Sequence, residues 1–346
     1  MRIVVNDIAA SNGGALSILK DFYSYVKFDT QNEWIFLLGD NYLEETDNIK
    51  IVTFPDVKRN KLKKVMFDLF NGAKYINQLN ADVVLSLQNI ITFGVKSRQI
   101  VYIHQVLPFQ TVKNFSFFKR AERVFAIYQK IIGKFIVLSA KKADKVIVQT
   151  EYMKKLLMSK TKIKADKIVC IMPNVEILDN YANGKTFDNH MFFYPTSKAV
   201  YKNNECIYNA CKILRDRGID NFEVKLTIED DAHVDNIKYV GRIPRDEVLV
   251  EYSKSTLLFP SYIESFGLPM AEARNIGTVI LASDCGFSRE VLSRYDNSYF
   301  FDYSNPRELA DLMEKVIKGI IVKKDIKAIP RMENSWSILM KVLQEK

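Results

Sequence analysis

Short apolar runs, rich in β-branched and aromatic residues, alternate along the chain with segments long enough to form helices. The first half contains RIVV (2–5), WIFLLG (34–39), DVVLSL (82–87), IVYIH (100–104), KVIVQT (145–150) and KIVCIM (167–172). The second half contains MFFYPT (191–196), VKLTI (224–228), IKYVG (237–241), TLLFPS (256–261) and TVILAS (278–283). Apolar strands separated by helices are typical of parallel sheets covered on both faces. Because the pattern occurs twice, it predicts an α/β protein with two doubly wound domains.

The domain boundary is predicted where turn-forming residues interrupt this pattern. IMPNVEILDN (171–180) has the Pro and Asn residues expected of a link between domains. We therefore expect one domain over residues 1–175 and a second over 176–330. The final stretch, 331–346, predicts a helix with Ser335 as its cap. Its apolar face consists of Trp336, Leu339, Met340 and Leu343.

Residues suited to ligand binding follow several of the predicted strands. Gly13 and Gly14 come after RIVV, His104 ends IVYIH, Lys202 follows MFFYPT and Glu264 follows TLLFPS. In doubly wound sheets, ligands bind at the carboxyl ends of the strands. With two such sheets, the natural place for a ligand is a cleft where these ends face each other.

One segment, FPSYIESFGLPMAEARNIGTVILASDCG (259–286), combines a predicted strand, a turn and a helix. Pro269 suits the first position of the helix and Gly277 suits its C-terminal end. This predicts that Glu272 lies in the first helical turn and Glu264 in the loop before it. Each glutamate alone has an ordinary explanation, since Glu272 could complement the helix dipole and Glu264 could be an exposed loop acid.

The turn between the two glutamates predicts an anion site. Backbone N–H groups around Gly267 and Leu268 would point out of the helix N-terminus, where they have no intrahelical partners. A phosphate group could bind there without a metal ion.

Positive charge is concentrated in the first half of the chain. Residues 1–175 hold 27 Lys and Arg against 15 Asp and Glu, a net of +12, whereas residues 176–346 hold 23 against 26, a net of −3. The basic residues gather in 57–70 and 113–142, where they alternate with apolar residues at roughly helical spacing. Such segments can lie on an anionic membrane surface, but they are equally typical of a solvated helix face.

Other classes of protein and site are disfavoured by composition. The chain has no run of about 18 uncharged apolar residues, and its N-terminus enters a strand pattern rather than a signal sequence. Its 4 cysteines and 3 histidines are scattered, without the spacing of a metal site. We therefore expect a cytoplasmic protein with structural thiols, no metal and no cofactor.

The motif F-P-S-x-x-E-S-F-G-L-P-x-x-E-A (259–273) closely resembles the E-x7-E signature of the retaining glycosyltransferases called group 1 or family 4. Segments 143–175, 239–261 and 12–15 are similar to other parts of that family, although Val175 stands where a glycine is usual. The resemblance implies a GT-B fold, in which two Rossmann-like domains face each other across a cleft. It also implies that the C-terminal helix crosses back to the first domain.

The resemblance implies roles for residues of the signature. Glu272 would hold the ribose hydroxyls of a nucleotide sugar, since a carboxylate can accept from two adjacent hydroxyls. Glu264 would contact the donor sugar. The loop between them would bind the sugar and diphosphate through Ser265, Phe266, Gly267 and Leu268.

The family neutralises the departing diphosphate with a basic pair after the first strand of the second domain. Lys202 matches one member of this pair. Ser197 occupies the position of the other, with Lys198 beside it, and both are candidates for the second phosphate contact. Lys198 could equally be an ordinary loop charge.

Further candidates lie in three other loops. His104 resembles a first-domain histidine that touches the transferred sugar or its phosphate, although a histidine of this kind is often a core residue bonded to backbone. Gly13 and Gly14 would let the backbone approach the donor phosphates. Ile243 lies where the family's nucleotide base contacts a backbone strand.

Together these features predict a retaining, metal-independent glycosyltransferase. The second domain would bind a nucleotide diphosphate sugar, and the first would bind a glycan or lipid-linked glycan acceptor at the inner face of the cytoplasmic membrane. Bacterial surface polysaccharide or lipopolysaccharide synthesis would suit such an enzyme. A nucleotide-sugar epimerase of the same architecture is the main alternative. A nucleic-acid-binding protein would also explain the basic half, but it gives no reason for the glutamate motif, so we expect no nucleic-acid partner.

Overall fold

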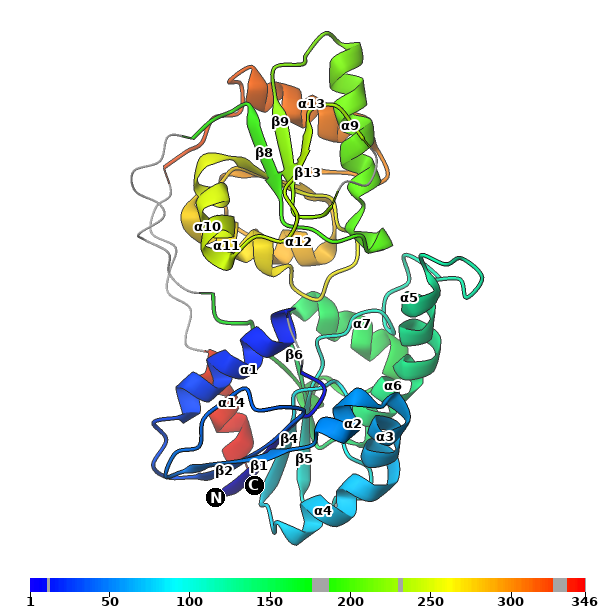
Figure 1. The fold of residues 1–346 in the computed structure, drawn as a ribbon, viewed down its shortest axis with the longest axis vertical. Helices are drawn as coiled ribbons and strands as arrows, with labels where there is room; N and C mark the ends of the chain where they lie inside the picture. Colours follow the sequence, from blue (N-terminus) through cyan, green and yellow to red (C-terminus); the bar gives the residue numbers. More distant parts are fainter. Residues whose placement is uncertain (11–12, 176–186, 230–232, 326–334, 346) are drawn as a thin grey trace. The chain divides into compact units, whose positions relative to one another are not determined.

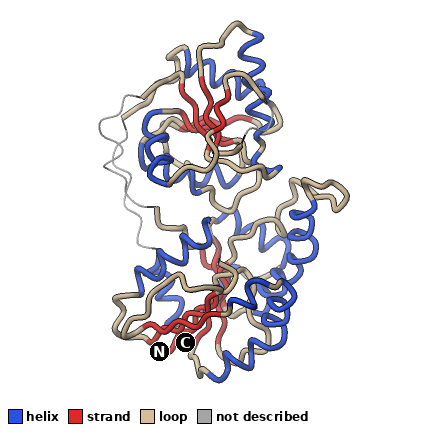
Figure 2. Tube along the Cα trace, viewed as in Figure 1, coloured by secondary structure: helices blue, strands red, loops and turns tan. Residues whose placement is uncertain are grey.

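The computed structural model describes residues 1–10, 13–175, 187–229, 233–325 and 335–345 (Figure 1). The chain divides into two compact units. The N-terminal unit comprises the described parts of 1–117, 123–174 and 332–346, and the C-terminal unit comprises those of 118–122 and 175–331. Figure 2 shows strands at the centre of each unit and helices around them.

The N-terminal unit is built on one parallel sheet of seven strands in the order β3-β2-β1-β4-β5-β6-β7. Its strands are β1 (Arg2–Asp7), β2 (Glu33–Leu38), β3 (Ile49–Thr53), β4 (Val83–Ser86), β5 (Arg98–Tyr102), β6 (Lys145–Val148) and β7 (Ile168–Cys170). Its helices are α1 (Gly13–Val26), α2 (Pro55–Arg59), α3 (Lys61–Met66), α4 (Gly72–Gln78), α5 (Arg123–Ile127), α6 (Gly133–Lys142), α7 (Glu151–Thr161) and α14 (Ser335–Gln344). Two π-helical turns, η1 (Phe67–Asn71) and η2 (Tyr128–Ile132), and the 3₁₀ turn η3 (Ala165–Lys167) complete the unit.

Helices cover both faces of this sheet, as the apolar runs predict. On one face, Ile3 and Val5 of β1 pack with Phe22 of α1 and Trp336 of α14 in a buried core. On the other face, β1 packs against η1 and α4. Burial on both faces explains why β1 reads as a continuous apolar run rather than an alternating one.

The last helix of the chain belongs to the core of the N-terminal unit. Trp336, Leu339 and Leu343 are buried there and Met340 packs against them, which confirms the predicted apolar face. The indole Nε1 of Trp336 donates to the Asp21 carboxylate at 2.7 Å. Ser335 was expected to be the cap but is the first residue of α14, and its hydroxyl donates to Asn174 Oδ1 at 2.5 Å.

The C-terminal unit has a parallel sheet of six strands in the order β10-β9-β8-β11-β12-β13. Its strands are β8 (Met191–Tyr194), β9 (Glu223–Leu226), β10 (Ile237–Tyr239), β11 (Thr256–Phe259), β12 (Ile280–Ser283) and β13 (Ser298–Phe301). Its helices are η4 (Val200–Lys202, 3₁₀), α9 (Asn204–Asp216), α10 (Arg245–Lys254), α11 (Leu268–Ile276), α12 (Gly286–Val291) and α13 (Pro306–Ile317). Helix α9 packs against α13, and α10 packs against α11. Each unit is therefore a doubly wound α/β domain, as predicted.

All 11 apolar runs form strands at the expected places, but two strands were not predicted. These are β3 and β13, which each lie at one edge of their sheet. An edge strand has one neighbour, and β3 and β13 are only partly buried. Their sequences, IKIVT and SYFF, therefore lack the long apolar run that marks a central strand.

Candidate active site

The carboxyl-end edge of the C-terminal sheet brings together Lys202 and Glu264. Lys202 follows β8 and Glu264 follows β11, and these strands are neighbours. The Lys202 Nζ lies 2.6 Å from Glu264 Oε1, and both side chains are less than one-fifth exposed. Ser261 also donates its hydroxyl to this carboxylate oxygen at 2.8 Å. The structure thus joins two residues that were predicted separately.

The ion pair determines the charge of Lys202. Burial by itself would lower the pKa of the ammonium, but the attraction of the Glu264 carboxylate outweighs burial and raises the pKa above its ordinary value. Lys202 therefore remains a cation across the physiological pH range.

The β8 and β11 loops are fastened together by hydrogen bonds. Asn203 has a left-handed backbone with φ 57°, and its side-chain amide donates to Pro260 O at 3.3 Å and to Tyr303 O at 2.9 Å. The Tyr194 hydroxyl donates to the Lys202 carbonyl at 3.1 Å. These bonds hold the backbone of Lys202 beside the loop that carries Glu264.

Helix α11 begins at a glycine that the local geometry requires. Gly267 has φ 86°, and a Cβ at this position would lie 2.6 Å from the Met270 side chain. Gly277 ends the helix with φ 83°, as predicted. Pro269 is the second residue of α11 rather than the first. Because Glu272 is the fifth residue, it lies in the second turn and not in the first turn as predicted.

This start leaves the amide end of α11 directed out of the loop between the two glutamates. First-turn N–H groups have no partner four residues earlier in a helix, and the helix dipole is positive there. Ser265 and Leu268 in this loop are half-buried, and Phe266 is buried. The loop therefore has the chemistry of an anion site.

Glu272 is buried and held by two residues that the sequence analysis missed. Its Oε1 lies 3.1 Å from the Arg245 guanidinium, and its Oε2 accepts the Tyr252 hydroxyl at 3.4 Å. Burial and the neighbouring Glu272 raise the pKa of Tyr252 well above its usual value, so the phenol keeps its proton and donates. The sequence RIPR after Gly241 could have indicated Arg245, because it directly follows a strand.

The other predicted donor-site residues lie on the same strand-end loops. Ser197 and Lys198 are exposed in the loop between β8 and η4. The Ser197 hydroxyl accepts from the Ala199 N–H at 3.5 Å, a local bond within this loop. Ile243 is half-buried in the loop between β10 and α10.

In the N-terminal unit, His104 is bonded to the backbone. It lies two residues beyond the end of β5, and its Nε2 is 2.5 Å from the Leu87 carbonyl. Burial lowers the pKa of His104 to about 4, so the imidazole is neutral at pH 7. Among the described residues, its buried Nδ1 has no hydrogen-bond partner. A neutral ring that donates through Nε2 leaves Nδ1 as an acceptor.

Gly13 and Gly14 are the first two residues of α1. They were expected in a glycine loop, but the structure places them at the start of a helix. Asn12, the residue before them, lies outside the described residues.

Part of the C-terminal unit is similar to a known protein family. Residues 209–329 match the family model described as "Glycosyl transferases group 1". The match includes Glu264, Glu272, Arg245 and the whole of α11. It supports assignment to that family.

Relatives of similar length agree with the match. The O-antigen chain mannosyltransferase RfbU of Salmonella typhimurium (strain LT2) is 22% identical over 283 residues, which cover 73% of this chain and 76% of that protein. HepE of Anabaena in complex with UDP-glucose superimposes with a TM-score of 0.63 at 14% identity, covering 92% of this chain and 90% of that one. The lipopolysaccharide outer core galactosyltransferase WaaB in its apo form gives a TM-score of 0.62 at 14% identity, covering 93% and 92%. These similarities show that the chain has the GT-B fold.

The N-terminal unit of this GT-B protein also contains a buried charge cluster that was not predicted. Lys64 of α3 lies 2.5 Å from the Asp68 carboxylate of η1, and Gln88 donates to Asp68 at 3.0 Å. Asp7, at the end of β1, is buried and electrostatically coupled to Lys64. Burial raises the pKa of Asp7 to about 7, although Lys64 opposes this shift. Lys64 was expected to be one of the surface lysines of segment 57–70, but it compensates buried acids instead.

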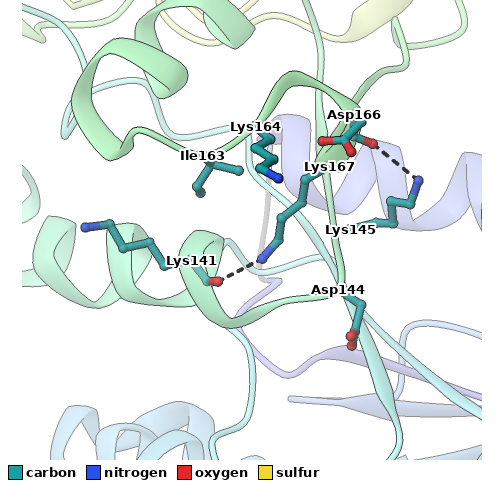
Figure 3. Close-up of a pocket in the computed structure, with 7 residues that line it drawn as sticks. All are labelled: Lys141, Asp144, Lys145, Ile163, Lys164, Asp166 and Lys167. Carbon is teal, nitrogen blue, oxygen red and sulfur yellow. Dashed lines mark hydrogen bonds between the residues drawn. The ribbon is translucent and has the colours of Figure 1, made fainter.

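The N-terminal unit has a pocket of about 430 Å³. Figure 3 draws the residues that line it. Its lining residues are Lys141, Asp144, Lys145, Ile163, Lys164, Asp166 and Lys167. Lys167 Nζ donates to the Lys141 carbonyl in the last turn of α6 at 2.7 Å, and Lys145 Nζ donates to the Asp166 carbonyl at 3.3 Å. Both lysines thus donate hydrogen bonds to backbone carbonyls. Lys167 places its positive charge at the C-terminus of α6, where the helix dipole favours a cation.

Neither a metal cluster nor a membrane-spanning helix is found in the described parts of the chain. No three or more His, Cys, Asp or Glu residues are grouped there in a way that could hold a metal ion. Within the same residues, every helix is too short or too polar to cross a bilayer. All 4 cysteines are free thiols.

Proposed function

We propose that this protein is a retaining glycosyltransferase that moves a sugar from a nucleotide diphosphate sugar to a glycan or lipid-linked glycan acceptor. The observation that carries the proposal is the strand-end edge of the C-terminal unit, where Lys202 pairs with Glu264 in the loop that leads into α11, the helix that carries Glu272. The family match covers this edge. The relative RfbU is named for O-antigen chain synthesis, and the neighbour HepE holds UDP-glucose. We infer a role in bacterial surface polysaccharide or lipopolysaccharide synthesis.

Lys202 and α11 would stabilise the departing diphosphate. The lysine supplies a full positive charge, and the helix supplies N–H donors and the positive end of its dipole. Stabilisation of developing charge by fixed groups of this kind is often worth several kcal/mol. We expect no metal ion in the reaction, because these groups provide the positive charge that the leaving group requires. Ser197 and Lys198 remain candidates for a second phosphate contact.

Retention of configuration would follow from attack on the face that the leaving group occupies. The bond between the anomeric carbon and the diphosphate oxygen breaks, and the acceptor oxygen bonds to the same face of that carbon. The proton of the acceptor hydroxyl passes to the departing phosphate oxygen. Glu264 would orient the donor sugar in this reaction. His104, neutral and with Nδ1 as an acceptor, is predicted to bind a sugar hydroxyl rather than to transfer a proton.

We further propose that the basic segments 57–70 and 113–142, which belong to the N-terminal unit except for residues 118–122, bind an anionic membrane. Large apolar side chains are exposed along both segments. In the first, Leu62 is 77% exposed and Phe70 is 65% exposed. In the second, Val124, Ile131 and Leu138 are exposed, on α5, η2 and α6 in turn. Apolar stripes flanked by Lys and Arg suit the interface of an anionic bilayer.

The two segments cover the same face of the N-terminal sheet. Val4 pairs with Val84, and Val84 with Gln99, so these residues point to one face. Phe67 of η1 packs with Val4 and Val84 on this face. Val101 lies two residues after Gln99 in β5 and therefore points to the same face, where Ile136 of α6 packs with it. The outer sides of both segments therefore point away from the same sheet face, as expected of a single membrane-binding surface.

A thermal-shift screen followed by a product assay tests the transferase proposal. Uridine, guanosine and adenosine diphosphate sugars are added separately, because a ligand that binds only the folded state raises the melting temperature. The donor that stabilises the protein is then incubated with and without a glycan acceptor, and the anomeric configuration of the product is determined by NMR. Sugar transfer with retention is expected. Failure of all three donors, or an isomerised donor formed without acceptor, would contradict the proposal, and the second result would indicate an epimerase.

A further inference from the structure

We infer that Arg245 is a positioning residue that allows the enzyme to recognise the ribose of its donor. The inference rests on the proposed function, in which Glu272 holds the ribose hydroxyls. Arg245 lies 3.1 Å from Glu272 Oε1 and comes from a different element, the first turn of α10. The two side chains therefore connect the loop after β10 to the middle of α11.

Burial makes this contact important for Glu272. The side chain of Glu272 is 8% exposed, whereas that of Arg245 is 48% exposed. A buried carboxylate without compensation takes up a proton, and a protonated acid accepts fewer hydrogen bonds from a diol. Arg245 favours the ionised form from the solvent side, and the Tyr252 hydroxyl contacts the other oxygen from the protein interior. The carboxylate is thus held in charge and in orientation before a ligand arrives.

The position of Arg245 in its own helix favours this interpretation over an incidental ion pair. Arg245 is the first residue of α10, directly after the N-cap Pro244. A cation is unfavourable at a helix N-terminus, where acids such as Asp246 and Glu247 are preferred. Arg245 therefore gains nothing from the dipole of α10, whereas its contact with the carboxylate of Glu272 is favourable.

The half-exposed Arg245 follows Ile243 by two residues in the chain, and Ile243 is where the base is expected. A donor whose ribose bonds to Glu272 would contact a carboxylate that Arg245 and Tyr252 already orient. A nucleotide that lacks one ribose hydroxyl would form fewer hydrogen bonds with Glu272 and would bind less tightly. We therefore expect Arg245 to affect the preference for ribose more than binding of the diphosphate.

The test compares ribonucleotides with deoxyribonucleotides. Calorimetry measures the dissociation constants of UDP, GDP and ADP and of their 2′-deoxy and 3′-deoxy forms. For the base that binds the wild type, we expect the ribonucleotide to bind about 10- to 100-fold more tightly than the deoxy forms, as for hydrogen bonds to a charged group. In Arg245→Ala, binding of the ribonucleotide should weaken about tenfold while binding of the deoxy forms changes little. The ratio of the deoxy to the ribonucleotide dissociation constant should therefore fall toward 1. Arg245→Lys, which keeps the charge but not the planar fork, should give an intermediate ratio.

Arg242→Ala is the matched control, because Arg242 is exposed in the same loop and should leave the ratio unchanged. The free-protein unfolding transition of each variant shows whether it is folded. A purely structural role for Arg245 would weaken ribo and deoxy forms equally and leave the ratio at its wild-type value, and that result would overturn the inference alone. If no diphosphate nucleotide binds the wild-type protein, the proposed function fails and this inference fails with it.

Discussion

The two units share one architecture but differ in where they carry charge and apolar surface. In the C-terminal unit, charged side chains beyond the strand ends form pairs between different elements, such as Lys202 of η4 with Glu264 and Arg245 of α10 with Glu272 of α11. In the N-terminal unit, Asp7, Lys64 and Asp68 form a buried cluster. Large exposed apolar side chains are also unevenly distributed: of the 16 in the described residues, 14 precede residue 176.

This difference leads to separate expectations for the two units. A doubly wound sheet supplies an edge at its carboxyl ends, but the side chains at that edge decide what can bind there. The C-terminal unit carries its candidate site residues at this edge, whereas the N-terminal unit also exposes basic and apolar residues on its outer helices. We therefore expect substitutions at the strand-end edge of the C-terminal unit to affect sugar transfer. Substitutions on the outer helices of the N-terminal unit should affect membrane binding.

The largest effect is expected at the strand-end edge of the C-terminal unit. Lys202→Ala should lower kcat about 10²- to 10³-fold, because the departing diphosphate loses its cation. Steady-state kinetics with a saturating donor measures this loss. The control is Lys212→Ala, an exposed lysine of α9 that belongs to none of the predicted contacts, for which we expect little change. Equal rates for the wild type and Lys202→Ala would contradict the assigned role.

Removing exposed apolar side chains from the N-terminal unit tests whether they bind a membrane. Combined substitution of Leu62, Met66 and Phe70 by Ser should weaken binding to vesicles of phosphatidylglycerol and phosphatidylcholine about 50-fold, since each side chain loses part of the roughly 1.5–3 kcal/mol gained on full burial. Vesicle co-sedimentation at low and high salt measures the binding. Ile320→Ser combined with Val322→Ser, at exposed sites of the C-terminal unit, is the control and should have no effect. Vesicle binding that survives the first set would contradict the proposed surface.

A pH experiment sharpens the contrast between buried and exposed charge. The folded pKa of Asp7 is about 7, far above its value in an unfolded chain, so ionisation favours unfolding. Well below pH 4, Asp7 is protonated in both states and contributes no difference. As the pH rises from about 4 to about 7, the wild type should lose stability relative to Asp7→Asn, by about 4 kcal/mol in total, since the pKa differs by roughly 3 units between the two states. Urea unfolding at several pH values measures this difference, and Asp47→Asn, at an exposed acid, should show no such trend.

The smallest effect concerns the helix that the end of the chain adds to the N-terminal unit. Trp336→Phe keeps most of the packing of α14 but removes the hydrogen bond to Asp21. The free energy of unfolding should fall by about 1 kcal/mol. Chemical denaturation followed by circular dichroism measures the change. A loss above about 3 kcal/mol would mean that the indole contributes mainly through packing rather than through this bond.

The fold was largely predictable because buried parallel strands leave long apolar runs in the sequence. The strands β3 and β13 were missed for the same physical reason, since an edge strand with half-exposed side chains has no such run. Helix α11 was predicted from Pro269 and Gly277, but its start was placed one residue late. The left-handed Gly267 caps the helix and allows it to begin at Leu268.

The candidate site was predictable only in part. Lys202 and Glu264 could be named from their places after strands, but the contact between them depends on β8 and β11 being neighbours. Arg245 was missed because only the packing of α10 against α11 places it beside Glu272. Lys64 was assigned to the surface because charge counts along a segment do not reveal which lysine faces buried acids.

Hydrogen exchange at the loop between the two glutamates tests the central claim most directly. Backbone amides of residues 262–272 are followed by mass spectrometry with and without each nucleotide diphosphate sugar, and Lys212→Ala and Lys202→Ala are measured in parallel. If Lys202 and the start of α11 bind the diphosphate, exchange in this peptide slows when the correct donor is added, and this protection is retained in Lys212→Ala and largely lost in Lys202→Ala. Unchanged exchange here, with donor-dependent protection confined to other parts of the chain, would contradict the claim.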